Sequence, residues 1–140
     1  MDKKLEDKLY KKYPKLFKER KLPLSKSAMA RGIECSDGWY FLIDELCNYI
    51  QMQITDKKCE EVTIKQIKEK FGRLVFHTDN NINDKILGAI SLATFLSYRV
   101  CENCGSTNNV ETKSDSVGYI STLCSDCRKR IKRLVPKEKE

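Results

Sequence analysis

The sequence predicts an α+β fold, in which a small helical body with a β-hairpin is followed by a C-terminal metal-binding module. Two long segments carry apolar residues at helical spacing, and a segment between them is rich in β-branched and aromatic residues around a glycine. The C-terminal third contains two Cys-x-x-Cys pairs. We therefore place the body at residues 1–99, with a basic N-terminal segment at 1–24, the zinc module at 100–135 and a charged tail at 136–140.

The N-terminal segment is expected to begin with a helix over residues 3–12, whose narrow apolar side is formed by Leu5 and Leu9. This helix should end before Pro14, because the residue that precedes a proline disfavours helical geometry. Proline suits the first turn of a helix, so a helix should start again at Pro14. An extended linker is then expected at residues 22–24. The narrow apolar side predicts docking onto the body; binding of RNA or a membrane is the alternative.

The longest helix is predicted from about Asp37 to about Ile54, with Ser36 or Asp37 as its N-cap. Phe41 and Met52 lie toward the polar side of this helix, and we expect them to pack on the N-terminal segment, with a partner contact as the alternative. One apolar stripe should be core, and it comprises Trp39, Leu42, Ile43, Leu46, Cys47, Ile50 and Ile54.

Residues 61–78 predict two strands joined near Gly72, with Leu74 and Phe76 on one face, although residues 64–70 also fit a helix. A turn at 79–81 should lead into a further helix from residue 82 or 83 to about 99. That helix runs directly into Cys101, so we expect the C-terminal module to pack on the body. The apolar positions of the helix are Ile86, Leu87, Ile90, Ala93, Phe95 and Leu96.

The C-terminal module contains two Cys-x-x-Cys pairs with nineteen residues between them. Four thiolates suit the closed tetrahedral site of one structural Zn²⁺ and leave no open position for a water nucleophile. Gly105 permits the tight turn that brings backbone N–H groups toward the thiolates. The alternatives are a pair of disulfides or two coincidental pairs. The predicted zinc ligands are Cys101, Cys104, Cys124 and Cys127, and we assign no chemistry to Cys35, Cys47 and Cys59.

The second cysteine pair opens a helix with two different faces. The inward stripe comprises Cys124, Cys127, Ile131, Leu134 and Val135. The predicted nucleic-acid-binding face comprises Arg128, Lys129, Arg130, Lys132 and Arg133. A cysteine knuckle, a hairpin over residues 110–112 and 119–123 with Gly118 near its turn, and then this helix follow the order of a treble-clef or zinc-ribbon-like module.

The motifs Cys-Glu-Asn-Cys and Leu-Cys-Ser-Asp-Cys resemble treble-clef zinc fingers of the GATA type over about 30 residues. The spacing between the pairs is longer than in GATA fingers, and the hairpin lacks their tryptophan and arginine. Four motifs also resemble a family of small uncharacterised bacteriophage and prophage proteins across nearly the whole chain. They are Tyr-Pro-x-Leu-Phe at 13–17, Glu-Cys-x-Asp-Gly-Trp-Tyr at 34–40, Lys-Glu-Lys-Phe-Gly-x-Leu-x-Phe at 68–76 and Cys-Glu-x-Cys-Gly at 101–105. This resemblance implies a phage-type context and a zinc site, but no reaction.

The formal net charge is +7, and four zinc-bound thiolates with one Zn²⁺ would lower it to about +5. Residues 1–24 hold nine Lys and Arg against four acids. Such a distribution fits binding to nucleic acid or an acidic protein; a solubilising surface is the alternative. No apolar run is long enough to span a bilayer, and the N-terminus lacks the apolar segment of a signal peptide, so we expect a cytoplasmic protein in a bacterial host.

The sequence lacks the usual signs of catalysis. Its single histidine, His77, lies outside the zinc module, whereas the nucleases built on treble-clef folds need a histidine beside a catalytic metal. No phosphate-binding loop, nucleophile elbow or His-Glu-x-x-His helix occurs. Glu34, Asp37 and Trp39 could form a small polar site, although helix capping and core packing explain them more simply.

We therefore expect a non-catalytic zinc-binding protein with no small-molecule substrate. Its partner is expected to be nucleic acid, DNA in particular, bound through the basic face of the last helix in phage control of transcription or genome handling. The alternative is a protein-binding inhibitor or adaptor directed at a host enzyme or defence system, with zinc in a purely structural role.

Overall fold

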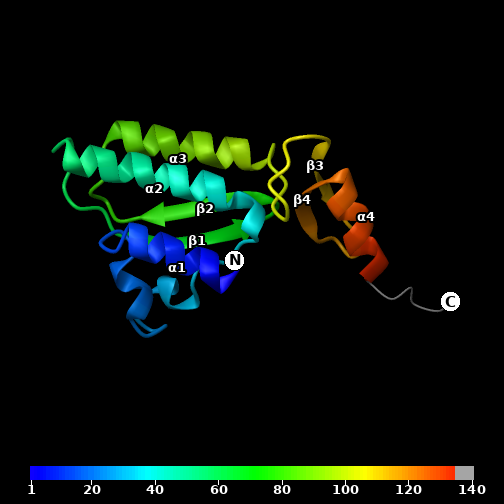
Figure 1. The fold of residues 1–140 in the computed structure, drawn as a ribbon, viewed down its shortest axis with the longest axis horizontal. Helices are drawn as coiled ribbons and strands as arrows, with labels where there is room; N and C mark the ends of the chain where they lie inside the picture. Colours follow the sequence, from blue (N-terminus) through cyan, green and yellow to red (C-terminus); the bar gives the residue numbers. More distant parts are fainter. Residues whose placement is uncertain (135–140) are drawn as a thin grey trace.

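A computed structural model describes the backbone of residues 1–134 and the side chains of residues 1–131. Helices α2 (Tyr40–Thr55) and α3 (Asp84–Ser97) lie side by side over an antiparallel hairpin of β1 (Ile64–Lys70) and β2 (Arg73–Thr78), and α1 (Lys3–Lys12) lies beside this hairpin (Figure 1). A second hairpin, β3 (Val110–Ser114) with β4 (Ile120–Cys124), and helix α4 (Ser125–Leu134) form a unit at one end. The predicted α+β class is confirmed.

Helix α1 has the predicted bounds, and its N-cap Asp2 accepts a hydrogen bond from the Lys4 N–H. The predicted restart of an α-helix at Pro14 is wrong, because turns and a 3-10 helix (Lys18–Lys21) follow instead. The Leu16 carbonyl accepts a hydrogen bond from the Ile64 N–H of β1, at 2.9 Å, so this stretch is held against the sheet. Its Leu16 and Phe17 side chains are fully buried, which confirms that the N-terminal segment docks on the body.

The linker expected at residues 22–24 leads into a turn, in which the Pro23 carbonyl accepts a hydrogen bond from the Lys26 N–H. A further 3-10 helix, Ala28–Arg31, follows this turn and buries Met29. The chain then runs beside β1, where the Glu34 N–H donates to the Ile67 carbonyl and the Glu34 carbonyl accepts from the Glu69 N–H. Leu16 of the N-terminal segment and Glu34 after it therefore cover the outer edge of β1.

Helix α2 confirms the predicted core stripe, with Trp39 of the preceding 3-10 helix (Asp37–Trp39) fully buried beside it. The expectation that Phe41 and Met52 pack on the N-terminal segment is wrong, because they are 70% and 52% exposed. The N-terminal segment reaches α2 through polar contacts at Asp44 instead. The Asp44 carboxylate accepts hydrogen bonds from Lys12 Nζ at 2.9 Å and Tyr13 Oη at 2.8 Å.

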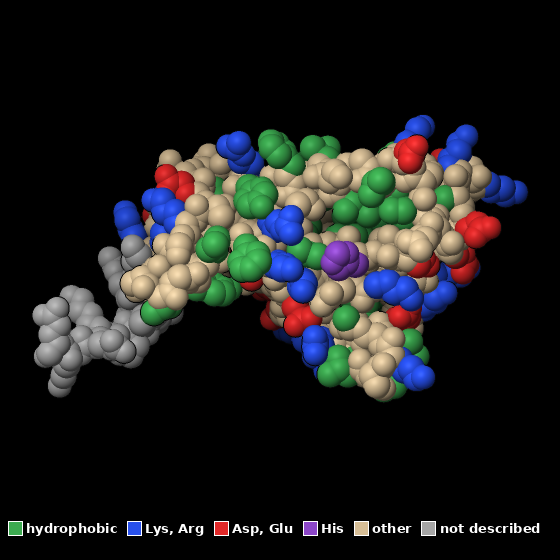
Figure 2. Space-filling model, turned by 180° about the vertical axis from the view of Figure 1, so that it is seen from behind, with side chains coloured by type: hydrophobic (Ala, Val, Ile, Leu, Met, Phe, Trp, Pro, Cys, Tyr) green, Lys and Arg blue, Asp and Glu red, His purple; other side chains and the backbone are tan. Residues whose placement is uncertain are grey.

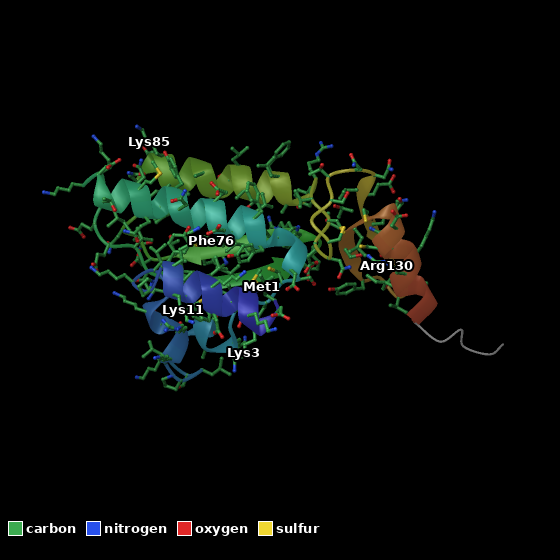
Figure 3. All side chains as sticks on the ribbon, in the orientation of Figure 1. Met1, Lys3, Lys11, Phe76, Lys85 and Arg130 are labelled. Atoms are coloured by element: carbon green, nitrogen blue, oxygen red, sulfur yellow. The ribbon has the colours of Figure 1, made fainter. Side chains whose placement is uncertain are left out.

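The hairpin joins β1 and β2 through Phe71 and Gly72, which both have positive φ angles, of 53° and 80°. Two consecutive positive φ values are typical of the tight turns whose twist matches that of a hairpin. Residues 64–70 are therefore a strand, and the helical alternative is excluded. Leu74 and Phe76 are both buried, which agrees with their predicted place on one face of the hairpin. Figure 3 labels Phe76, which lies between the hairpin and the helices.

Helix α3 forms where predicted, and the side chain of its N-cap Asn83 accepts a hydrogen bond from the Ile86 N–H. Ile86, Ala93 and Ser97 are buried. Four large apolar side chains of the same helix are exposed to solvent, namely Leu87, Leu92, Phe95 and Leu96. Figure 2 shows hydrophobic side chains on the surface of this part of the molecule. Helix α3 is therefore apolar on its outer side as well as its inner side.

The C-terminal unit packs directly on the body, as expected. The Trp39 indole N–H donates to the Val100 carbonyl at 2.9 Å, and the Gly38 N–H donates to the Glu102 carbonyl at 2.6 Å. On the other side, the Thr122 hydroxyl donates to the Gly72 carbonyl at the tip of the first hairpin. These contacts fix the beginning of the cysteine knuckle on the body.

Replacement of Gly38 by Ala should destabilise the protein, because a Cβ atom there would overlap the carbonyl oxygens of Cys101 and Glu102. We expect a loss of about 1–3 kcal/mol in the free energy of unfolding, measured by urea denaturation. The control is Gly88→Ala, which meets no heavy atom within 4 Å and should stabilise α3 by about 0.5–1 kcal/mol. Equal stabilities for the Gly38→Ala variant and the wild type would contradict the close approach.

Glu19 is buried beside Lys65, with 2.6 Å between Oε2 and Nζ. The Lys65 ammonium lowers the pKa of Glu19 although burial opposes this shift, and Ser27 adds to the lowering. A lowered pKa in the folded state stabilises the fold above the unfolded-state pKa of about 4.3, and this contribution is lost as the pH falls through the folded-state value.

Glu19→Gln should therefore reduce the free energy of unfolding by about 1–3 kcal/mol at neutral pH, and its difference from wild type should shrink below about pH 4. Urea denaturation at several pH values measures the free energies of unfolding of the variant and the wild type. The control is Glu61→Gln, because Glu61 pairs with Lys15 at 3.4 Å between side chains that are 59% and 77% exposed. Such an exposed pair should contribute about 1 kcal/mol at most. A pH-independent effect of Glu19→Gln would contradict the ion pair.

Candidate metal centre

Two short segments position the four predicted cysteine ligands. Cys101 and Cys104 belong to a turn that follows α3, in which the Gly105 N–H donates to the Cys101 carbonyl at 2.9 Å. Gly105 has a φ of +80°, which glycine adopts at little steric cost. Cys124 is the last residue of β4, and Cys127 lies in the first turn of α4. The spacing of three residues at the start of a helix places both thiols on one side.

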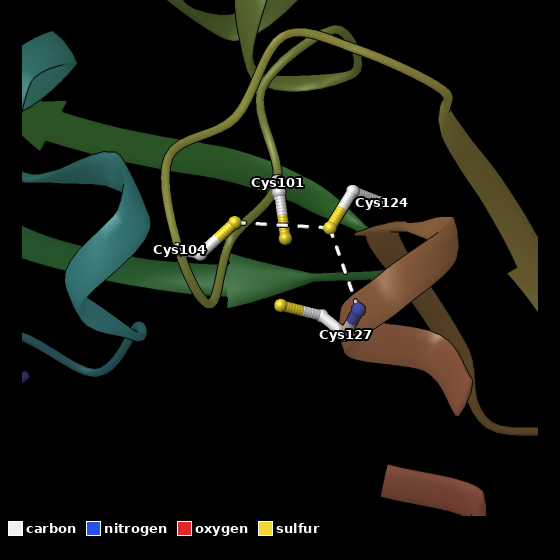
Figure 4. Close-up of side chains that lie close together, drawn as sticks. All are labelled: Cys101, Cys104, Cys124 and Cys127. Carbon is white, nitrogen blue, oxygen red and sulfur yellow. Dashed lines mark hydrogen bonds between the residues drawn. The ribbon is translucent and has the colours of Figure 1, made fainter. Parts of the chain in front are cut away.

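The four sulfur atoms lie within 4.8 Å of one another (Figure 4). Cys101, Cys124 and Cys127 are buried, and Cys104 is exposed. All four are free thiols rather than disulfides, and the Cys104 and Cys124 sulfurs are 3.7 Å apart. Zn–S bonds of about 2.3 Å would place the sulfurs of a tetrahedral site about 3.8 Å apart. The predicted ligands therefore come together in a group that could hold a metal ion, and its size fits zinc.

Nitrogen donors surround this group. The Ser106 N–H donates to Cys104 Sγ and the Cys127 N–H donates to Cys124 Sγ, both at 3.4 Å. Two side chains donate to Cys127 Sγ, Asn103 at 3.3 Å and Arg130 at 3.0 Å. Donors of this kind favour thiolates over thiols and orient metal ligands.

The sulfurs differ in their affinity for protons. Burial raises the pKa of Cys127, but hydrogen bonds with Asn103, Arg130 and the neighbouring cysteines together outweigh burial and lower that pKa to about 6. At Cys104 the Ser106 N–H favours the thiolate, yet burial and the neighbouring cysteines together raise the pKa to about 12. Four adjacent thiolates repel one another, and a bound dication would offset this repulsion. The site is thus suited to a cation.

The sequence analysis did not recognise Asn103 and Arg130 as donors to the site. Asn103 lies between the first two cysteines, and Arg130 lies one helical turn beyond Cys127, so spacing alone could have identified them. Arg130 was instead predicted to contact nucleic acid; in the structure its guanidinium donates a hydrogen bond to Cys127 Sγ at 3.0 Å.

The other predicted nucleic-acid contacts have different surroundings. Arg128 donates to the Glu111 carbonyl at 2.7 Å and to the Ser121 carbonyl at 3.2 Å, so it joins α4 to both strands of the second hairpin. The Lys129 side chain is exposed. The side chains of Lys132 and Arg133 lie outside the described ones. The role of these residues in nucleic-acid binding stays a prediction.

The predicted inward stripe of α4 is wrong at Ile131, which is 41% exposed. Among the described side chains, the buried cluster of the C-terminal unit consists of Leu123 and three cysteines, with Val110 packed against it, and Ile131 is not part of this cluster. Leu134 and Val135, predicted for the same stripe, lie outside the described side chains, and the predicted tail at 136–140 lies outside the described residues.

The second candidate site, at Glu34, Asp37 and Trp39, is not a polar pocket. Trp39 is fully buried, which confirms that it packs in the core. Asp37 does not cap its own helix; its carboxylate accepts the Asp2 N–H at 2.7 Å and so supports the start of α1. The Glu34 backbone pairs with β1. His77 lies on β2, outside the cysteine group.

No protein-family model, curated protein or solved structure matches this chain. The resemblance to bacteriophage proteins therefore stays a prediction. None of the helices within residues 1–134 has both the length and the apolar character required to cross a membrane.

The four clustered cysteines should bind one metal ion per chain, and Ser at any one of these positions should lower the metal content measured by elemental analysis. The control replaces Cys35, Cys47 and Cys59 together by Ala. Burial raises the pKa of Cys35 to about 12 and also raises the pKa of Cys47 and Cys59, so these thiols are poor ligands. Loss of metal in the control variant would refute the ligand assignment.

Proposed function

We propose that this is a non-catalytic binding protein in which the four cysteines hold one structural Zn²⁺. The observation that carries this proposal is the group of four sulfurs within 4.8 Å, three of them on buried cysteines. Four thiolates complete a tetrahedral zinc site and leave no position for a reacting water. Soft sulfur ligands in this geometry also fit iron–sulfur chemistry, and elemental analysis separates the two metals.

The metal would serve in place of a hydrophobic core. Among the described side chains of the C-terminal unit, the buried cluster contains one apolar side chain, Leu123, besides three cysteines. So small a core cannot fold a segment of this length, whereas zinc binding contributes roughly 10–16 kcal/mol to small zinc-binding peptides. Chelation of the metal should therefore unfold the C-terminal unit while the larger core of the body persists.

We propose that the partner is DNA in a bacterial cytoplasm, in phage control of transcription or genome handling. Support comes from the net charge of +7 and from the basic run of α4, whose first turn the metal site anchors. Because Arg128 and Arg130 already contact carbonyl and sulfur atoms, we assign the phosphate contacts to the remaining cations of the run, Lys129, Lys132 and Arg133.

The proposal predicts salt-sensitive binding of duplex DNA, with a slope of about −0.9 in log K against log salt for each phosphate contacted. Replacing Lys129, Lys132 and Arg133 by Gln should reduce the slope by about 2–3, because up to three contacts are lost. A matched variant with Gln at the exposed positions Lys3, Lys4 and Lys8 has the same net charge and should retain the slope. Absence of wild-type binding at about 50 mM salt would refute DNA association.

A second candidate function is a protein-binding inhibitor or adaptor directed at a host enzyme or defence system. The outer side of α3 favours it, since Leu92 and Phe95 are 56% and 57% exposed. Exposed apolar side chains that lie together mark protein interaction sites. A host protein recovered stoichiometrically after nuclease treatment, and lost with Leu92→Glu or Phe95→Glu, would support this function over DNA binding.

A further inference from the structure

A groove of about 370 Å³ runs between β2 and α3. One wall is the outer edge of β2 from Arg73 to Thr78, and the other wall is formed by α3 and the segment before it, through Ile82, Leu87 and Ile90. The molecule's single histidine, purple in Figure 2, also lines the groove, and hydrophobic side chains lie close to it on the surface. None of the described residues that line this groove belongs to the metal centre or to α4.

Strand β2 is an edge strand, and α3 closes only one end of its outer edge. At Leu74 the N–H donates to Ser97 Oγ at 2.9 Å, and the carbonyl accepts from Thr94 Oγ1 at 3.2 Å. Backbone groups of an antiparallel strand alternate in direction, so the next outward groups belong to Phe76 and Thr78. In residues 1–134, no hydrogen bond satisfies the outward N–H and C=O of Phe76. The open part of the edge therefore lies along the groove.

The two faces beside this edge differ in chemistry. On the helix side the groove presents Leu87, which is 54% exposed, and Ile90. On the solvent side, the outer face of the hairpin carries Lys68, Lys70 and Arg73, and none of these has a carboxylate at ion-pair distance within the described structure. A strand added beside β2 would direct alternate side chains to these two faces.

We propose that the open edge of β2 binds an extended segment of a partner protein by strand addition. Backbone hydrogen bonds to Phe76 and Thr78 would hold the segment, aliphatic side chains at alternate positions would fill the groove against Leu87 and Ile90, and acidic side chains between them would approach Arg73 and Lys68. An edge of amide donors and acceptors calls for another polypeptide backbone. Two copies of a chain of charge +7 repel each other, so an acidic partner fits better than a second copy.

The test screens the full metal-loaded chain against a displayed library of random dodecapeptides. We expect enriched sequences in which aliphatic and acidic residues alternate. A synthetic peptide of such a sequence should slow hydrogen exchange at the amides of Phe76 and Thr78. Leu87→Glu should weaken its binding by about tenfold or more, as loss of a central apolar contact does.

Leu92→Glu is the matched control, because Leu92 is 56% exposed on the same helix but lies outside the groove. This variant should bind the peptide as the wild type does. Variants of Lys129, Lys132 and Arg133 should also bind it normally, so failure of DNA binding and failure of this proposal are distinguishable.

Several results would overturn the proposal. They are a library that yields no binder, a peptide that is sensitive to Leu92→Glu instead of Leu87→Glu, and a peptide that binds equally well after N-methylation of its alternate amides. If sedimentation shows a dimer of the wild type that the Leu87→Glu variant does not form, the groove binds a second copy of the chain. If the Leu87→Glu variant loses DNA binding, the groove binds nucleic acid.

Discussion

A close crossing of two backbone segments at Gly38 joins the body to the C-terminal unit. Gly38 approaches the backbone of residues 101 and 102 so closely that only hydrogen fits as its side chain, and its N–H donates to the Glu102 carbonyl. The neighbouring Trp39 is part of the body core, while Cys101 is part of the cysteine group. The crossing therefore fixes the first cysteine pair relative to the hydrophobic core, and the contact of Thr122 with Gly72 attaches the second hairpin to the body as well.

The C-terminal unit combines this attachment with a dense arrangement of charge. Four sulfurs share a small volume, and donors from the knuckle and from α4 converge on them. Arg128 and Arg130 connect α4 to the hairpin and to Cys127, so two cations of the basic run also have structural roles. Consequently the basic run of α4 is not only a candidate binding surface. Two of its arginines donate hydrogen bonds to backbone carbonyls and to a cysteine sulfur inside the unit.

The body presents its own unusual surfaces. Leu16 and Glu34 cover one edge of its hairpin, and α3 covers only one end of the other edge. A two-stranded sheet with an open edge is seldom stable alone, and here the helix layer provides the buried surface that stabilises it. The outer side of α3 adds apolar residues that no part of residues 1–134 buries. Together these features favour protein contacts on the body, on a surface separate from α4.

The sequence by itself determined most of the elements and the cysteine group. Helical periodicity predicted the core stripe of α2 from Ile43 to Ile50, Gly72 marked the hairpin turn, and the Cys-x-x-Cys spacing identified four cysteines that come together in space. These signals are local, because helical pitch, turn geometry and ligand spacing act over a few residues. The restart predicted at Pro14 failed because a hydrogen bond to distant Ile64 overrides a local preference.

Only the tertiary structure decided which apolar residues are buried and which cations are free. Leu87 and Phe95 belong to the apolar positions predicted for their helix, and Phe41 was expected to pack on the N-terminal segment. All three are exposed because no element packs over them within the described structure. Arg128 looks like a surface cation, yet its guanidinium donates to the Glu111 carbonyl, 17 residues away in the chain. Periodicity assigns a residue to a face of a helix, but what lies opposite that face depends on segments far away in the sequence.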